Sequence, residues 1–108
     1  MHQPPRPSHC ELCGRHGLPL TRHHLIPRTR HSNRRNKRDF DRNEVHTRIL
    51  WVCRPCHSQI HATFTEKELE REYNTREALL AHPGMQGFTE WLRKKPPGFK
   101  PGVRRSRH

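Results

Sequence analysis

Two pairs of cysteines constrain this chain more than any other feature of its sequence. The pairs Cys10-Glu-Leu-Cys13 and Cys53-Arg-Pro-Cys56 are separated by residues 14–52. Each pair has the spacing at which two thiolates bind the same zinc ion, and two such pairs supply the four sulfurs of a tetrahedral site. Disulfides are the alternative, disfavoured because the N-terminal residues do not resemble a secretion signal. We therefore expect one structural zinc that closes the long loop between the pairs.

The composition indicates that a chain of this length needs a source of stability besides apolar burial. Only 29% of the 108 residues are hydrophobic, against roughly 45–50% apolar residues, glycine included, in an ordinary domain. A single small domain with so little apolar surface gains little stability from burial alone. We expect one domain over residues 9–95, between flexible basic tails at 1–8 and 96–108, which are rich in proline and arginine and lack periodic apolar residues.

The charge of the chain indicates its class of partner. Lys and Arg number 22 against 10 Asp and Glu, giving a formal net charge of +12. Such an excess of positive charge favours a polyanionic partner, most commonly nucleic acid. The alternative is a basic surface that has no specific partner. No run of about 20 apolar residues is present, so we expect a cytoplasmic protein that has no membrane partner.

Two apolar runs predict a pair of strands. Leu18–Ile26 is expected to form a short strand or hairpin arm, closed by Pro27 because the residue before a proline disfavours helix. Ile49–Val52 is β-prone and ends at the second cysteine pair, so it is the predicted partner. Pairing would bring the two cysteine pairs together. Residues 28–45 are expected to be a long basic loop, either functional or simply solvated.

Helices are predicted for the rest of the chain. Pro55 fits the first turn of a helix that places Ile60 and Phe64 on one face and His57 and His61 on another. A second helix is expected after a capping box at Thr65–Glu68, with Leu69 and Tyr73 facing inward. A third is expected after a cap at Asn74, with Ala78 and Leu79 facing inward. A last helix is expected before Pro96, with an apolar face made of Phe88, Trp91 and Leu92.

Four histidines are expected to lie close together. His23 and His24 end the first strand, and His57 and His61 lie one turn apart on the helix that follows the second cysteine pair. Two histidines at i and i+4 bind one cation well, and a third nitrogen from the strand would leave positions open for water and a phosphate oxygen. The competing interpretation of His57 and His61 is that they are extra zinc ligands or hydrogen-bonding groups of the core.

These motifs together resemble the HNH endonuclease family, the ββα-metal or His-Me finger nucleases. The resemblance rests on Cys10-x-x-Cys13, on His23-His24-Leu25-Ile26-Pro27-Arg28, and on the segment from Leu50 to His61. It covers residues 10–64. It implies a small α+β fold, namely a ββα-metal finger held together by zinc. Residues 65–95 resemble the additional C-terminal helices of small free-standing bacterial and phage members.

The resemblance also implies roles for single residues. His24 matches the general base, whereas His23, His57 and His61 match ligands of a catalytic divalent ion such as Mg²⁺, Mn²⁺, Ni²⁺ or Zn²⁺. Cys10, Cys13, Cys53 and Cys56 match the structural zinc site of many members. The reaction implied is hydrolysis of DNA that leaves 5′-phosphate and 3′-hydroxyl ends. A neutral imidazole suits the removal of a proton from water near pH 7.

One position departs from the family's pattern. Members usually carry an asparagine nine residues before the histidine of the second motif, and here that position is Arg48. A general base needs an orienting partner, and the candidates for orienting His24 or contacting phosphate are Asn43, His46 and Arg48. Both strand-end histidines can face one phosphate only if the strand ends or bulges there.

The basic segment is the predicted contact for DNA. Its candidate phosphate-binding residues are Arg28, Arg30, Arg34, Arg35, Lys37 and Arg38. Such contacts give salt-sensitive affinity with little sequence information. The expected function is therefore a metal-dependent endonuclease with weak sequence specificity, acting as a monomer or homodimer without an organic cofactor. The alternatives are a non-catalytic zinc-knuckle module that binds nucleic acid and, with less support from the charge, a zinc domain that binds proteins.

Overall fold

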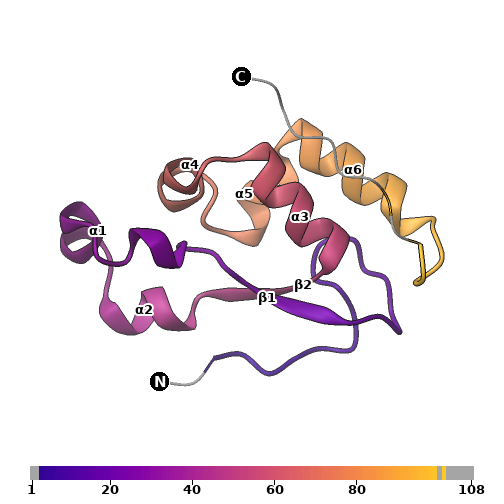
Figure 1. Cartoon of the computed structure of the whole chain (residues 1–108), viewed down its shortest axis with the longest axis horizontal. Helices are drawn as coiled ribbons and strands as arrows, with labels where there is room; N and C mark the ends of the chain where they lie inside the picture. Colours follow the sequence, from indigo (N-terminus) through magenta and orange to yellow (C-terminus); the bar gives the residue numbers. More distant parts are fainter. Residues whose placement is uncertain (1–2, 100, 102–108) are drawn as a thin grey trace.

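The computed structural model describes residues 3–99 and residue 101, and it shows a small α+β fold built on a two-stranded antiparallel sheet (Figure 1). The described helices and strands, in chain order, are β1 Leu20–His24, the 3₁₀ helix η1 Arg28–Arg30, α1 Arg34–Asp39, α2 Arg42–Thr47, β2 Ile49–Cys53, α3 Arg54–Thr63, α4 Glu66–Arg71, α5 Arg76–Ala81 and α6 Pro83–Arg93. In this part of the chain, no helix is both long and apolar enough to cross a membrane.

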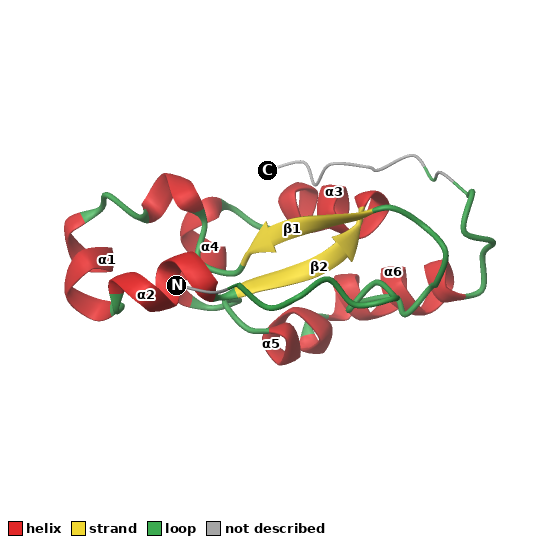
Figure 2. Ribbon diagram, turned by 90° about the horizontal axis from the view of Figure 1, so that it is seen from below, coloured by secondary structure: helices red, strands yellow, loops and turns green. Residues whose placement is uncertain are grey.

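The predicted pairing of the two strands is confirmed. β1 and β2 are antiparallel, with Leu20 opposite Cys53 and His24 opposite Ile49. β1 is shorter than expected because Leu25 and Ile26 leave the strand and are buried in the core. Figure 2 shows the two strands side by side, and in Figure 1 the helices α3, α5 and α6 all lie above them, so these helices gather on one side of the small sheet.

The helices after β2 begin close to the predicted places. The helix expected from Pro55 is α3, with Pro55 in its first turn and Ile60 fully buried. The capping box is present, because the Thr65 hydroxyl accepts from the Glu68 amide while the Glu68 carboxylate accepts from the Thr65 amide. The cap of α5 is Thr75, not Asn74, and α4 ends at Arg71, before Tyr73.

The segment expected to be a long loop is instead folded into three short helices. η1, α1 and α2 span residues 28–47, which we call the basic arm. The side chains of Asn33 and Asp41 accept hydrogen bonds from the first amides of α1 and α2, and so cap both helices. The sequence pattern did not indicate these helices, because the segment lacks apolar periodicity. Helix caps at Asn and Asp are short-range features that do not depend on that periodicity.

A buried carboxylate attaches the basic arm to α4. Glu70 is fully buried, and its Oε2 accepts from Asn36 Nδ2 at 2.6 Å. Its Oε1 accepts from Arg30 Nε at 3.2 Å and Arg71 Nε at 3.0 Å. Burial raises the pKa of Glu70, but the Asn36 hydrogen bond and the charges of Arg71 and Arg30 outweigh it and lower that pKa. Arg42 completes the network by donating to Asn36 Oδ1 at 2.8 Å.

The ends of the domain are attached in part. Residues 3–8 have no helix or strand, yet Gln3 Nε2 donates to the His46 carbonyl and the Trp51 indole donates to the Pro4 carbonyl, each at 3.0 Å. Of the two predicted tails, residues 1–2, 100 and 102–108 lie outside the described residues.

Candidate metal centres and their surroundings

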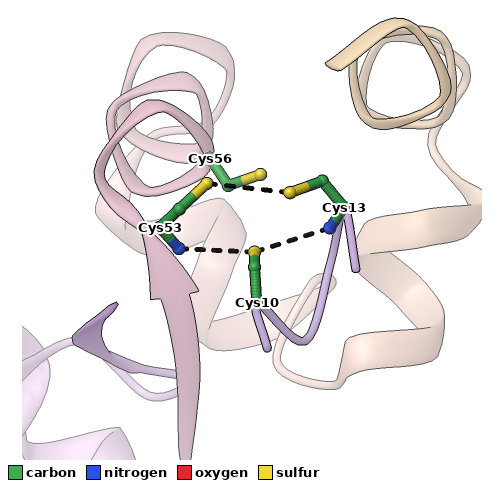
Figure 3. Close-up of side chains that lie close together, drawn as sticks. All are labelled: Cys10, Cys13, Cys53 and Cys56. Carbon is green, nitrogen blue, oxygen red and sulfur yellow. Dashed lines mark hydrogen bonds between the residues drawn. The ribbon is translucent and has the colours of Figure 1, made fainter. Parts of the chain in front are cut away.

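All four cysteines meet in one buried cluster, as the sequence predicts. Cys10 and Cys13 come from the turn before β1, Cys53 ends β2 and Cys56 lies in the first turn of α3, and Figure 3 shows their sulfurs turned toward one another. The sulfurs lie within 4.8 Å of each other, and those of Cys13 and Cys53 are 3.8 Å apart. Two sulfurs bound to one tetrahedral zinc at about 2.3 Å are separated by about 3.8 Å. The cluster therefore fits a structural metal such as zinc.

The groups around the cysteines stabilise negative sulfur. The amides of Cys13 and Cys53 point at the Cys10 sulfur, at 3.5 and 3.3 Å. Arg15, only 5% exposed, places Nη2 3.7 Å from the Cys53 sulfur. Hydrogen bonds from Cys10, then from Cys53 and Cys56, lower the pKa of Cys13. Such outer contacts fix thiolate ligands and compensate their charge.

The C-terminal helices hold the first cysteine turn in place. Arg76, in α5, donates through Nε to the Glu11 carbonyl at 2.7 Å, and Arg93, at the end of α6, donates to the Cys13 carbonyl at 3.2 Å. The Glu11 carboxylate in turn accepts from the Trp51 amide at 2.7 Å. The helical extension thus supports the cysteine cluster from outside.

Three of the four predicted histidines form a second cluster. His23 of β1 lies against His57 and His61 of α3, with ring centroids 5.4 and 5.5 Å away. One ligand nitrogen from each lies within 4.8 Å of the others. His23 is 1% exposed, and neither of its ring nitrogens has a hydrogen-bond partner among the described residues. A buried imidazole without partners is costly, and a bound cation would satisfy it. The residues present therefore fit a divalent metal.

The same packing lowers the pKa of two of these rings, those of His23 and His57. Burial, followed by the charges of His57, His61 and His24, lowers the pKa of His23 to about 3. Burial, followed by the charges of His61 and His24, lowers the pKa of His57 to about 4. Metal binding requires the unprotonated imidazole, so at neutral pH a metal would displace no proton from His23 or His57.

Two side chains that the sequence did not single out contact the helical histidines. Thr21 Oγ1 lies 2.8 Å from His57 Nδ1, and a carboxylate oxygen of Glu66 lies 3.6 Å from His61 Nδ1. Thr21 precedes His23 by two residues, so strand alternation places both on one face, and that signal was available in the sequence. No sequence pattern indicates the contact of Glu66 with His61, because the position of Glu66 depends on the turn between α3 and α4.

His24 does not join the other three histidines. β1 is regular through His24 and ends there without a bulge, so its ring faces away from that of His23. It lies instead 6.2 Å from the ring of His31. Burial, followed by the charges of Arg28 and His31, lowers the pKa of His24, while the charge of His24 acts on His23 and His57. His24 therefore lies within electrostatic range of the three-histidine cluster.

The candidates for orienting His24 lie in the basic arm. Among the described residues, none forms a hydrogen bond with the His24 ring. Asn43 and His46 are exposed in α2, and His46 stacks edge-on against His31 at 5.4 Å. Arg48 is engaged elsewhere, donating to Glu44 at 2.6 Å and to the side chain and carbonyl of Asn74. The ring beside His24 is that of His31, which is half-buried.

The predicted DNA-binding residues all lie on η1 and α1 of the basic arm. Arg30 is committed to Glu70 and Arg38 pairs with Asp39 at 3.0 Å. The remaining four are exposed and form no ion pair within residues 3–99 and 101: Arg28, Arg34, Arg35 and Lys37. These four guanidinium and ammonium groups are available to an anionic partner.

Comparison with known proteins places the chain in a family. It is 36% identical over 88 residues to the uncharacterized protein YisB of Bacillus subtilis (strain 168), an alignment that covers 82% of this chain and 76% of YisB. No family model matches the chain, and no solved structure matches it. The chain therefore belongs to the protein family of YisB.

Proposed function

We propose that this chain is a metal-dependent HNH endonuclease that hydrolyses DNA phosphodiester bonds with little sequence specificity. The observation that carries the proposal is His23, a buried imidazole whose two nitrogens have no hydrogen-bond partner among the described residues and whose ring packs against His57 and His61. A protein that only needed a zinc scaffold would gain nothing from a second, half-open cluster of ligands beside its cysteines.

The arrangement of elements supports the finer description of the fold as a ββα-metal finger. Two antiparallel strands lead into α3, and the cysteine cluster joins the strand end, the helix start and the preceding turn. The histidine ligands then come from the first strand and from the helix. This order is the one that the resemblance to HNH nucleases implies.

In the proposed reaction, residues of this chain bind the metal and move one proton. His23, His57 and His61 would hold a divalent ion, which when bound acts as a Lewis acid toward the phosphoryl and leaving oxygens. His24, kept neutral by burial and neighbouring charges, accepts a proton from water as the water oxygen bonds to phosphorus. The P–O3′ bond breaks with its electron pair on O3′, which takes up a proton from solvent.

The basic arm provides the substrate contact in this proposal. Arg28 follows the histidine strand directly, and α1 carries three further exposed charges, on Arg34, Arg35 and Lys37. Phosphate contacts of this kind position a duplex without reading bases. We infer that the arm holds the DNA backbone while the scissile phosphate lies at the histidine cluster.

One observation favours a second candidate, a zinc module that binds nucleic acid without cleaving it. His24 lacks a hydrogen-bonded orienting partner among the described residues, and the family's asparagine is replaced by Arg48, which is engaged with Glu44 and Asn74. A base without an orienter is a weak catalyst.

Incubation with supercoiled plasmid separates the two candidates. The zinc-loaded protein is tested in EDTA and then with Mg²⁺, Mn²⁺, Ni²⁺ or Zn²⁺ in excess, alongside a His57→Ala variant. Nicking that requires added metal and is lost in His57→Ala supports the nuclease. Salt-sensitive binding without cleavage under any of the four metals would establish the binding module instead.

A further inference from the structure

The hydroxyl of Thr21 links the strand pair to the histidine cluster. It lies in β1 on the same face as His23 and is half-buried. Its hydroxyl oxygen contacts two groups, the Val52 carbonyl at 3.1 Å and His57 Nδ1 at 2.8 Å. Val52 is its partner in the strand pairing, so the backbone itself fixes the position of this hydroxyl.

The two contacts of this hydroxyl can both be hydrogen bonds in only one way. A carbonyl oxygen only accepts hydrogen bonds, so in that arrangement the single hydroxyl proton of Thr21 is donated to Val52. The oxygen is then left to accept from His57, which must carry a proton on Nδ1. A neutral imidazole has one N–H, so Nε2 of His57 is left with a free lone pair.

We propose that Thr21 is a positioning residue that holds His57 in the Nδ1–H tautomer and presents Nε2 as the metal ligand. The ring is fixed in rotation as well as in tautomer, because its Nδ1 edge is tied to the strand. The role of Nε2 as a ligand rests on the metal site of the proposed function. The tautomer rests on the two hydrogen bonds of the Thr21 hydroxyl and not on the metal.

Nitrogen NMR of the histidine rings tests the tautomer directly, in the zinc-loaded protein at pH 7.5 without added second metal. The ¹⁵N shifts distinguish a protonated from an unprotonated ring nitrogen. We expect His57 to be protonated at Nδ1 in the wild type and in Thr21→Ser. In Thr21→Val, which keeps the shape and removes the hydroxyl, the Nε2–H form that free histidine favours in water should appear.

Thr89→Val is the matched control. Thr89 is buried in α6, and its hydroxyl also donates to a carbonyl, that of Gln86 at 3.1 Å. Among the described residues it forms no hydrogen bond with a histidine, so its loss should leave the His57 shifts unchanged. A wild-type His57 protonated at Nε2, or a Thr21→Val spectrum identical to that of the wild type, would overturn the proposal.

Metal affinity supplies the second readout. Ni²⁺ is titrated calorimetrically into the zinc-loaded proteins, with His23→Ala used to subtract binding elsewhere. Loss of the outer hydrogen bond of a ligating histidine costs about 10-fold to 100-fold in affinity, so Thr21→Val should bind Ni²⁺ at least about 10-fold more weakly. Thr21→Ser and Thr89→Val should bind as the wild type does.

The two readouts keep this proposal separate from the proposed function. If the wild type binds no Ni²⁺ at the histidines, the metal site fails, and the tautomer of His57 still decides the role of Thr21. If Ni²⁺ binds equally well to wild type and Thr21→Val, Thr21 does not position His57, and the metal site stands without it.

Discussion

His23 shows at the scale of one residue what the proposed metal site costs in stability. Its ring is almost fully buried and both nitrogens lack hydrogen bonds within the described part of the chain. Leaving a buried polar atom unsatisfied costs about 1–3 kcal/mol. In a small domain with 29% hydrophobic residues that cost is a large share of the total stability, and a bound metal would remove it.

Acid should therefore destabilise the protein whose histidine cluster is free of metal. The folded-state pKa of His23 is lowered to about 3, below the ordinary value of about 6.5, so below pH 6.5 the unfolded chain binds the extra proton. From pH 7 to pH 5.5 this group should cost about 1 kcal/mol of unfolding free energy. Urea titrations at both pH values check the difference between wild type and His23→Phe.

We expect His23→Phe to lose less stability over this interval than the wild type. His9→Phe, a substitution at an exposed histidine outside the cluster, serves as the control and should follow the wild type. Equal losses in wild type and His23→Phe would show that His23 is not held neutral by burial.

At the scale of the elements, the basic arm is the part of the fold that the sequence predicted least well. The apolar runs located the strands, Pro55 located the start of α3, and the cysteine and histidine spacings located both clusters, because all of these are local patterns. The helices of the arm depend on caps at Asn33 and Asp41 and on contact with Glu70. That contact joins residues 34 positions apart, and a buried glutamate looks like any surface glutamate in a sequence.

Removal of the buried carboxylate should loosen the arm. Glu70→Ala leaves Asn36, Arg30 and Arg71 without their shared acceptor, and breaking a buried charged network costs about 3–5 kcal/mol. Since Arg30 is partly exposed, we expect Glu70→Ala to lower the free energy of unfolding by about 2–4 kcal/mol. Denaturant unfolding gives the magnitude, and limited trypsin digestion should cut within residues 28–47 faster than in the wild type.

Glu77→Ala is a suitable comparison, because Glu77 is exposed in α5 and the helix would remain. It should change stability by less than about 0.5 kcal/mol and leave the digestion pattern intact. If Glu70→Ala behaved like Glu77→Ala, the arm would not depend on this network.

The charges of the arm should set the salt dependence of DNA binding. Arg34 and Arg35 are adjacent, exposed and without ion pairs in residues 3–99 and 101. If each contacts one phosphate, the double change to glutamine should reduce the slope of log K against log salt by about 1.8, since one duplex contact contributes about 0.9. Fluorescence anisotropy with a short duplex at several salt concentrations measures it.

A double variant at Arg6 and Lys94, both exposed and outside the arm, keeps the same net charge change. It should shift the slope much less. Equal slopes for the two double variants would mean that binding depends on total charge and not on the arm.

At the scale of the whole molecule, the cysteine cluster connects parts of the chain that have little else in common. It joins the first turn, the end of β2 and the start of α3, while Arg76 and Arg93 fasten α5 and α6 to the same turn. A metal held there links the sheet to the helices that pack on it. Its binding free energy is then folding free energy.

Loss of one thiolate should therefore unfold the domain. Cys53→Ser is expected to lose stoichiometric zinc and its cooperative thermal transition. His61→Ala removes a ligand from the other cluster, so it should retain one zinc per chain and melt cooperatively. Metal analysis of the purified proteins, with circular dichroism melts, checks both. A zinc-free Cys53→Ser that melts like the wild type would contradict a structural role for this site.

The most direct test of the account compares plasmid nicking by wild type, His24→Ala and His9→Ala under the metal that best supports cleavage. His24 is half-buried at the end of β1, so its removal leaves both ligand clusters complete. We predict that His24→Ala binds DNA and Ni²⁺ as the wild type does and loses at least about 100-fold in rate, the lower range for a general base, while His9→Ala keeps full activity. Undiminished nicking by His24→Ala would contradict the assignment of His24 as the base.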